Sequence, residues 1–364
     1  MKITHIRTTP FTIPMAQALG FAQAVMTATE HVLVEIETDE GLTGIAEAPS
    51  RSFIYGESQR SIVAAIETWF APGIIGRDPF HLDAVWAELD RVAFNHTAKG
   101  AIDLALHDIM GQALGIPCAR LLGGGAESLR ATYVCGAAKP EIMAEQVLAI
   151  HERYGIDAFK LKVGVDPGKD AAMLARVREA SPQALLYVDG NQAFRQHEAL
   201  RMLAVCADHG VAWAEEPCAV HDRAARHIVA RQGGVPILGD ESCTTPQEVA
   251  REIADGTIHL VSIKLARTGF RRGRDILGLC AGHSIRPMIG SQGDSGVGVV
   301  AAAQFGAAHL TPQALPGELS FHLNLAGNVL EEIPAIRGGR LMVPQSPGMG
   351  VKIDRSKLEQ FRVT

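Results

Sequence analysis

The sequence predicts an α/β fold, a modified (β/α) TIM-like barrel of about eight strands with an N-terminal α+β capping domain that the C-terminal tail completes. Short apolar runs ending in Asp189, Glu215 and Asp240 recur about every 25 residues. The same interval reaches Lys162 on one side and Lys264 on the other. A unit of this length accommodates a buried strand, a loop and an amphipathic helix, which is the repeat of a parallel barrel.

The length of the chain, 364 residues, leaves room for a barrel and a second domain. We expect a capping domain over 1–125, the catalytic barrel over 126–325, and a C-terminal segment over 326–364 that packs back on the cap. The first 125 residues do not follow the barrel repeat, and their strand and helix signals come in separate blocks. This order is typical of an α+β domain.

The cap opens with two predicted strands, over 32–38 and 42–48, joined by a turn at Asp39-Glu40-Gly41. Three segments with apolar residues at helical spacing follow and end at glycine, proline or a polar break. They cover 56–76, 78–94 and 96–115. Pro117 and the glycines at 123–125 mark the transition to the barrel.

The barrel is predicted from short apolar strands that alternate with helices and are buried on both faces. The strand candidates cover 131–136, 157–164, 184–191, 211–217, 235–242, 259–266, 285–293 and 317–323. Helices are expected to begin near 140, 167 and 245, and to lie near 196–209, 272–282 and 296–308.

The composition excludes several classes of protein. A hydrophobic fraction of 47% argues against extended disorder, and a formal charge of −6 without basic runs argues against binding to nucleic acid. No apolar stretch is long enough for a membrane span, and the N-terminal residues lack a signal-peptide core, so we expect a cytoplasmic protein. Six scattered cysteines predict reduced, buried thiols.

The three acidic strand ends predict a site for a hard divalent cation. Because the carboxyl ends of barrel strands share one mouth, Asp189, Glu215 and Asp240 would face one cavity. Carboxylate oxygens suit Mg²⁺ or Mn²⁺. Zinc is disfavoured, because no histidine or cysteine lies at the same position of the repeat. A polar residue near each acid could hold it in place: Asn191, Glu216 and Glu241. Helix capping or a rim salt bridge is the alternative for any single acid.

Lys160 and Lys162 lie two positions apart on one strand, so both side chains point the same way. Two close ammonium groups, with a cation nearby, would lower a lysine pKa and allow one lysine to move a proton. Lys264 enters from across the barrel and could reach the opposite face of a substrate carbon. Solvated or acid-paired lysines are the alternative. Together the acids and lysines favour enolate chemistry.

The segments FKLKVG, VDGNQA, WAEEP, GDES and SIKLARTG resemble the enolase superfamily, and within it the muconate lactonizing subgroup with a KxK motif on the second strand. The resemblance extends into the cap, through VEIETDEGLTGIAEAP and AKGAIDLALHDIMGQALG. It implies that Asp189, Glu215 and Asp240 bind the metal, that Lys162 is the principal acid/base, and that Lys160 lowers its pKa. Lys264 would be the second lysine, either as the opposite-face base or as an electrostatic stabiliser.

The resemblance also implies that two cap loops, near Met15–Met26 and Ser50–Tyr55, close over the substrate, with Phe21, Phe53 and Tyr55 as contacts. Relatives commonly carry a glutamate on the seventh strand, whereas this chain has Asp294 within GSQGDSG.

We further expect Asp294, Ser295 and Phe321 near the substrate. The glycine-rich run at 293–298 could cradle a phosphate, but we favour its backbone N–H groups as receivers of a distal carboxylate.

The eighth strand bears on the substrate. Dipeptide epimerases of the subgroup carry a DxD there to hold an ammonium group, whereas this chain reads GELSFHL, with Ser320 and His322 nearby. This favours a small-molecule dicarboxylate and a Mg²⁺- or Mn²⁺-dependent muconate cycloisomerase, which would be a homo-oligomer as relatives commonly are.

A racemase or epimerase of N-acylated amino acids, dipeptides or proline-like acids is the main alternative. A sugar-acid dehydratase is disfavoured because His283 is not on the seventh strand. A non-catalytic metal-dependent binding protein is the third hypothesis.

Overall fold

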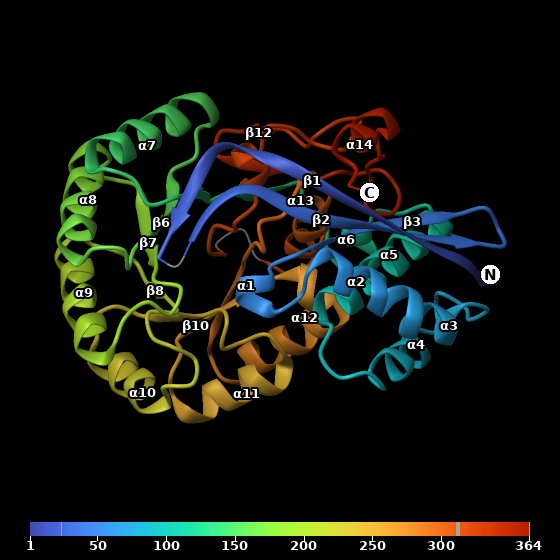
Figure 1. Ribbon diagram of the computed structural model, residues 1–364, viewed down its shortest axis with the longest axis horizontal. Helices are drawn as coiled ribbons and strands as arrows, with labels where there is room; N and C mark the ends of the chain where they lie inside the picture. Colours follow the sequence, from blue (N-terminus) through green and yellow to red (C-terminus); the bar gives the residue numbers. More distant parts are fainter. Residues whose placement is uncertain (23, 311–313, 364) are drawn as a thin grey trace.

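The computed structural model describes residues 1–22, 24–310 and 314–363. Figure 1 shows an antiparallel sheet with its helices lying against a curled parallel sheet that other helices surround. The predicted fold class, a modified barrel with an α+β cap, is confirmed. In the described part of the chain, no helix is long and apolar enough to cross a membrane.

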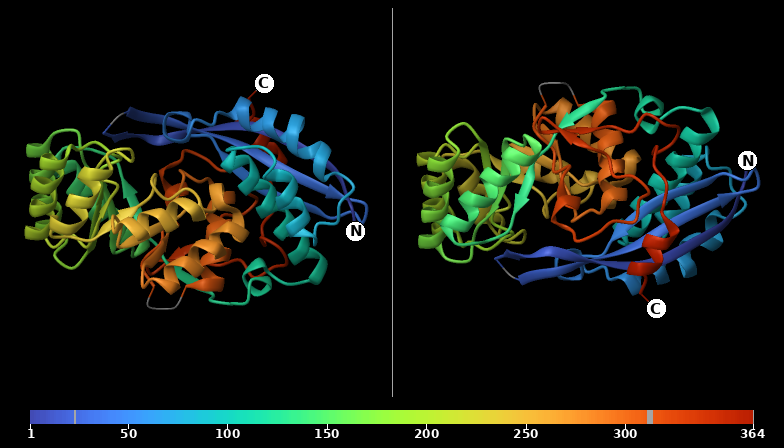
Figure 2. Two further views of the ribbon diagram at one scale, coloured as in Figure 1. Left: turned by 90° about the horizontal axis from the view of Figure 1, so that it is seen from below. Right: turned by 90° about the horizontal axis from the view of Figure 1, so that it is seen from above.

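The cap sheet has the order β1-β2-β3, with β1 (Ile3–Phe21), β2 (Ala24–Thr38) and β3 (Thr43–Pro49) antiparallel. The two predicted cap strands correspond to the end of β2 and to β3. Strand β1 was not predicted, because Pro10 and Pro14 interrupt its pattern; an edge strand tolerates them since it pairs on one side. The β1–β2 ribbon extends past the cap toward the barrel (Figure 2).

The cap helices follow β3 and pack on the sheet. The 19-residue helix α5 is buried over most of its length between β3 and a barrel helix, which explains its nearly continuous apolar sequence. These helices are α1 (Ser52–Tyr55), α2 (Gln59–Ala65), the π-helix η1 (Ile66–Phe70), α3 (Ala71–Ile74), α4 (Leu82–Leu89), α5 (His96–Leu114) and α6 (Cys118–Leu121).

Within the described residues, the barrel sheet has seven parallel strands in sequence order, where eight were expected. They are β5 (Tyr133–Cys135), β6 (Ala158–Lys162), β7 (Leu185–Asp189), β8 (Ala214–Glu215), β9 (Ile237–Gly239), β10 (Leu260–Ile263) and β11 (Arg286–Ile289).

The expected eighth strand, at 317–323, is reduced to a single bridge between Gly317 and Ala131. Glu318 N still donates to Ile289 O, so this segment joins both edges of the sheet. The chain then turns into the 3₁₀-helix η2 (Phe321–Asn324), while Ser320 Oγ donates to the carbonyl of Thr132. The alternating sequence pattern predicts a strand here, but the hydrogen bond from the Ser320 side chain takes the place of backbone pairing with the neighbouring strand.

The barrel helices lie outside the sheet and form the arc seen in Figure 1. Helix α10 was not among the predicted elements, and α12 begins seven residues earlier than expected because the kink at Gly269, with φ +58°, resembles a helix start in the sequence. The helices are α7 (Pro140–Tyr154), α8 (Pro167–Ala180), α9 (Gln196–Asp208), α10 (Arg223–Gln232), α11 (Pro246–Asp255), α12 (Leu265–Gly282) and α13 (Gly296–His309).

The C-terminal segment returns to the cap. Strand β12 (Ile336–Arg337) pairs with β13 (Arg340–Met342), which pairs with β4 (Ser128–Arg130), and α14 (Arg355–Phe361) packs on β1. Arg355 forms an ion pair with Glu35 of β2, and Phe11 bridges to Arg362. All six cysteines are buried and free, as predicted.

Candidate active site

Strand register places the predicted site residues at one mouth of the barrel. Lys162 lies opposite Asp189 across the β6–β7 pair, and Asp189 lies opposite Glu215 across the β7–β8 pair. Asp240 follows β9 directly, and Lys264 follows β10. The interval of about 25 residues in the sequence therefore becomes a side-by-side arrangement of charges in space.

The lysines of β6 hold two of the acids. Lys160 Nζ lies 3.0 Å from Asp189 Oδ2 and 2.8 Å from Glu215 Oε2. Lys162 Nζ donates to Asp189 Oδ2 at 2.6 Å. All of these groups except Lys162 are almost completely buried. A buried charge needs a partner, and here each acid of the pair has a lysine.

The third acid is held from the other side. Lys264 Nζ and Arg267 Nη1 both donate to the carboxylate of Asp240, the second at 2.9 Å. Tyr55 brings the cap to the same place, because its hydroxyl accepts from Arg267 Nη1 at 2.6 Å and from Lys264 Nζ at 3.2 Å. A cap residue thus touches a barrel lysine more than 200 residues away.

The pKa directions follow from these contacts. Burial lowers the pKa of Lys160, but the carboxylates of Asp189, Glu215 and Glu318 outweigh it and hold that pKa well above its usual range. The pKa of Lys264 is likewise raised, chiefly by Asp240 against burial. Of the β6 pair, for which the sequence predicts a lowered lysine pKa beside a cation, Lys160 is held in the opposite direction by these carboxylates.

The acids supply the oxygen donors that a divalent cation prefers. Both carboxylate oxygens of Glu215 are buried, and apart from the ion pair of Oε2 with Lys160 neither has a hydrogen-bond partner among the described residues. Burial and the charge of Asp189 raise the pKa of Glu215, and Asp240 adds to the effect, so the three acids feel one another. Of the residues that the structure describes, no three acidic, histidine or cysteine side chains form a group that could hold a metal ion. In this arrangement lysine ammonium groups contact Asp189 and Asp240. The donor set is all-oxygen, as Mg²⁺ prefers.

The residues predicted to support the acids lie behind them. Asn191 Oδ1 accepts from Lys162 at 2.6 Å, and Asn191 Nδ2 donates to Glu241 Oε1 at 3.0 Å. Burial, with Asp240 and Asp189 nearby, raises the pKa of Glu241 to about 8.

Glu216 holds the turn after β9. Its Oε2 accepts from the backbone N–H of Asp240, at 2.9 Å, and from both the N–H and the hydroxyl of Ser242, while Arg226 pairs with Oε1. Glu216 has a positive φ of 35°, a backbone conformation that non-glycine residues rarely adopt. Strained conformations of this kind are concentrated at functional sites.

The two cap loops meet over the mouth. Phe21, at the tip of the β1–β2 ribbon, stacks on Phe53 of α1 with ring centroids 5.5 Å apart. Lys162 Nζ lies 5.9 Å from the centre of the Phe21 ring. The predicted loop near Met15–Met26 is this ribbon, and residue 23 within it lies outside the described residues.

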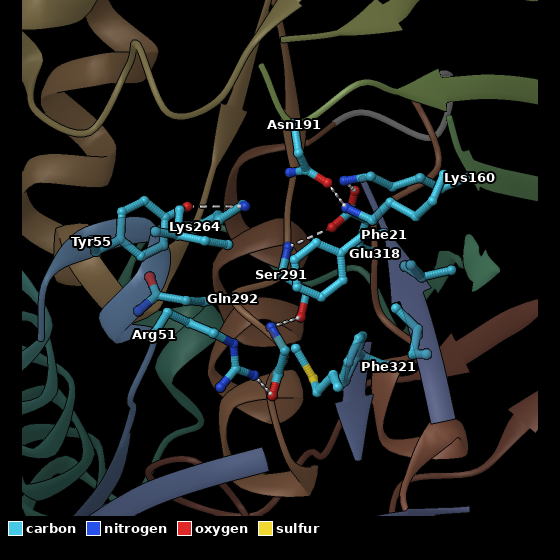
Figure 3. Close-up of a pocket in the computed structure, with 16 residues that line it drawn as sticks. Phe21, Arg51, Tyr55, Lys160, Asn191, Lys264, Ser291, Gln292, Glu318 and Phe321 are labelled. Carbon is cyan, nitrogen blue, oxygen red and sulfur yellow. Dashed lines mark hydrogen bonds and ion pairs between the residues drawn. The ribbon is translucent and has the colours of Figure 1, made fainter. Parts of the chain in front are cut away.

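A cavity lies between these loops and the strand ends (Figure 3). Of the predicted site residues, all three lysines, Asn191, Phe21, Tyr55 and Phe321 line it. Phe53 is half exposed and covers Phe21 from outside. Asp294 and Ser295 do not line it: Asp294 Oδ1 accepts from Gln292 N, and Ser295 donates to Glu47.

The backbone N–H groups that we expected to receive a distal carboxylate are engaged within the protein. Ser291 Oγ accepts from the N–H of Gly293 and of Asp294, and Glu47 accepts from the N–H of Ser295. This use of the glycine-rich run was wrongly predicted, because Ser291 and Glu47 satisfy the donors first.

The sequence did not reveal four polar residues that line the cavity: Arg51, Ser291, Gln292 and Glu318. Glu318 accepts from Lys160 Nζ at 2.7 Å, from the Tyr187 hydroxyl at 3.0 Å and, through Oε2, from Ser291 N at 2.8 Å. A signal existed for Glu318, since it is the acid of the predicted eighth strand. For Arg51 there was none beyond its place in a predicted lid loop.

Comparison with known proteins identifies the class. Residues 3–123 match the mandelate racemase/muconate lactonizing enzyme N-terminal domain, and residues 142–357 match the enolase C-terminal domain-like family. The chain belongs to the enolase superfamily, and within it to the group that resembles muconate lactonizing enzymes. Members of this superfamily use a divalent metal, and the muconate cycloisomerases and epimerases among the relatives are isomerases.

Different relatives are named for different reactions. A muconate lactonizing enzyme from Mycobacterium smegmatis, in complex with muconolactone, shares 38% identity and a TM-score of 0.97, with both chains covered completely. A hydrophobic dipeptide epimerase from Enterococcus faecalis is 30% identical over 96% of this chain and 99% of its own. Muconate cycloisomerase 1 from Rhodococcus opacus is 28% identical over 99% and 98%.

Proposed function

We propose that this enzyme is a cycloisomerase that converts cis,cis-muconate to muconolactone. The supporting observation is the charge of the cavity. Arg51, Lys160, Lys162 and Lys264 line it, and among its described lining residues Glu318 is the one carboxylate. Glu318 already accepts three hydrogen bonds, so it offers little to a substrate ammonium group. A dianionic substrate without an amine suits this lining.

The proton transfer would fall to Lys162. In the reaction an oxygen of the C1 carboxylate adds to C4, the C4=C5 electron pair moves to C5, and the negative charge spreads into the C6 carboxylate as an enolate. A proton from Lys162 Nζ then reaches C5. The lysine is oriented for this by Asp189 Oδ2 and Asn191 Oδ1, each 2.6 Å from Nζ. General acid catalysis of this kind contributes about 10²- to 10⁴-fold.

Other residues stabilise and enclose the substrate. Lys160 and Lys264 place positive charge beside the carboxylate that gains electron density, and Phe21 with Phe53 covers the mouth and excludes water. Asp189, Glu215 and Asp240 are the residues that would hold the metal. When bound, Mg²⁺ or Mn²⁺ supplies Lewis-acid stabilisation of negative charge on carboxylate oxygens.

Racemisation or epimerisation of N-acylated amino acids or dipeptides is the second candidate. It is favoured by lysines on two sides of the cavity: Lys264 donates to Tyr55 and Lys162 donates to Asn191. Figure 3 shows Tyr55 and Lys264 on one side and Asn191 on the other. One lysine would remove the α-proton and the other would return a proton to the opposite face.

Proton NMR in D₂O separates the two. The metal-loaded enzyme is incubated with cis,cis-muconate and, in parallel, with N-succinyl amino acids and dipeptides. Muconolactone carrying one deuterium at C5 supports the cycloisomerase. Exchange confined to the α-carbon of the amino-acid compounds refutes it and supports the second candidate.

A further inference from the structure

We propose that Arg51 is a specificity-determining residue, the binding group for a second carboxylate of the substrate, at the end of the cavity away from Lys160 and Asn191. Figure 3 shows the Arg51 guanidinium on one side of the cavity, with Lys160 and Asn191 on the other. The inference rests on the proposed function in taking the substrate as an acid held by its first carboxylate near the lysines.

Arg51 is a buried cation without a direct acidic partner. Its side chain is 5% exposed, yet it lines the cavity. Among the described residues no carboxylate oxygen lies within the 4.0 Å of an ion pair with its guanidinium. Asp294, Glu47 and Glu30 act on it only at longer range. Buried charges are usually paired, so this arrangement favours an anionic ligand.

The guanidinium has donors to spare. It uses one N–H for the carbonyl of Ser50 and one for Gly293 O, at 2.9 Å. An arginine has five N–H groups, so three remain for an acceptor, and their planar arrangement matches a carboxylate.

The backbone is shaped to hold Arg51 in this position. Gly293 has φ +81°, and a Cβ built on it would lie 1.7 Å from Arg51 Nη2. Only glycine allows the guanidinium to lie against this turn. Arg51 also directly precedes lid helix α1, whose Ile54 and Tyr55 N–H groups donate to Arg51 O. Binding of a carboxylate at Arg51 would thus be coupled to placement of the lid.

The alternative receivers for a second carboxylate are already occupied. The N–H groups of Gly293, Asp294 and Ser295 donate to Ser291 and Glu47. Gln292 Nε2 donates to Pro49 O and to Thr97 Oγ1. Arg51 is therefore the group at this end of the cavity that retains donors and charge.

The test compares adipate, an unreactive six-carbon dicarboxylate, with monomethyl adipate, by calorimetric titration of the Mg²⁺-loaded enzyme. We expect the wild type to bind adipate more tightly, and Arg51→Gln to reduce this preference roughly 10- to 100-fold. Arg51→Lys should keep part of it, since it retains charge but loses the planar pair of donors. Arg60→Gln, an exposed arginine of α2 in the same cap, should leave the ratio unchanged.

The outcomes separate this inference from the proposed reaction. If folded Arg51→Gln keeps the wild-type preference, or if the wild type shows none, the inference is overturned. If Arg51→Gln fails to fold, Gly293→Ala provides the second variant: its Cβ displaces the guanidinium, and an unchanged preference refutes the inference. Because adipate is not turned over, loss of the preference without any muconolactone from muconate would refute the reaction and leave Arg51 as the carboxylate site.

Discussion

Replacement of Lys162 by methionine tests the centre of the proposed mechanism. Methionine keeps most of the side-chain volume and removes the ammonium group. The loss of a general acid costs about 10²- to 10⁴-fold in kcat, which corresponds to roughly 3–5 kcal/mol of barrier. Binding should change less, because Lys160 and Lys264 remain in the cavity with their charges.

The fold should tolerate this change. The Lys162 side chain is 12% exposed at the cavity, and Asp189 retains Lys160 at 3.0 Å when the contact at 2.6 Å is lost. Steady-state kinetics with cis,cis-muconate, combined with a thermal melt, separates catalysis from stability. The matched control is Lys169→Met on α8, whose side chain is 80% exposed and should leave kcat unaltered. A folded Lys162→Met enzyme with kcat within tenfold of the wild type would refute the assignment of Lys162 as the proton donor.

Three further predictions concern the supports of the site. Glu216→Gln should destabilise the protein by about 1.5–3 kcal/mol in urea unfolding, because Arg226 would lose one of its two buried carboxylate partners and keep Glu252, whereas a loss below about 0.5 kcal/mol would contradict the role of this ion pair. Glu47 has its folded pKa raised to about 8 from 4.5 by burial and by Asp294, so the protonated form is favoured in the folded state. Its contribution to stability is present below about pH 4.5 and is lost as the pH rises toward 8. The free energy of unfolding should therefore fall less between pH 5 and pH 8 in Glu47→Gln than in the wild type. An equal fall in the two proteins would contradict the titration of Glu47 in this range. Chelation should abolish turnover and lower the melting temperature, and Mg²⁺ or Mn²⁺ at 100 times its dissociation constant should restore about 2.7 kcal/mol; an unaltered melting curve would argue against metal binding in the folded state.

The acids and lysines of the site could be found from the sequence because the barrel repeat is local. Each strand, loop and helix occupies about 25 residues, and strand ends of a parallel sheet share one edge. The positions of Lys162, Asp189 and Glu215 therefore predicted their neighbouring places in the register. The roles assigned to them stay predictions until the variants are measured.

Local patterns also explain the misses in the fold. Strand β1 contains Pro10 and Pro14, which an edge position tolerates but a sequence pattern penalises. The segment at 317–323 alternates like a strand, yet Ser320 bonds the carbonyl of Thr132 and the chain turns into η2. Whether a strand has a partner on each side is a property of the assembled sheet.

The sequence by itself determined the barrel, the cap and the ring of charges at the mouth, because periodicity and strand direction are encoded over short distances. Tertiary structure alone decided which groups meet across the chain. Arg51 reaches Gly293 over 242 positions, and Lys160 reaches Glu318 over 158. Such contacts depend on how the cap seats on the barrel and on a glycine that leaves room for a guanidinium. No local pattern carries that information, because the energy of a side-chain contact depends on distance in space and not on separation in sequence.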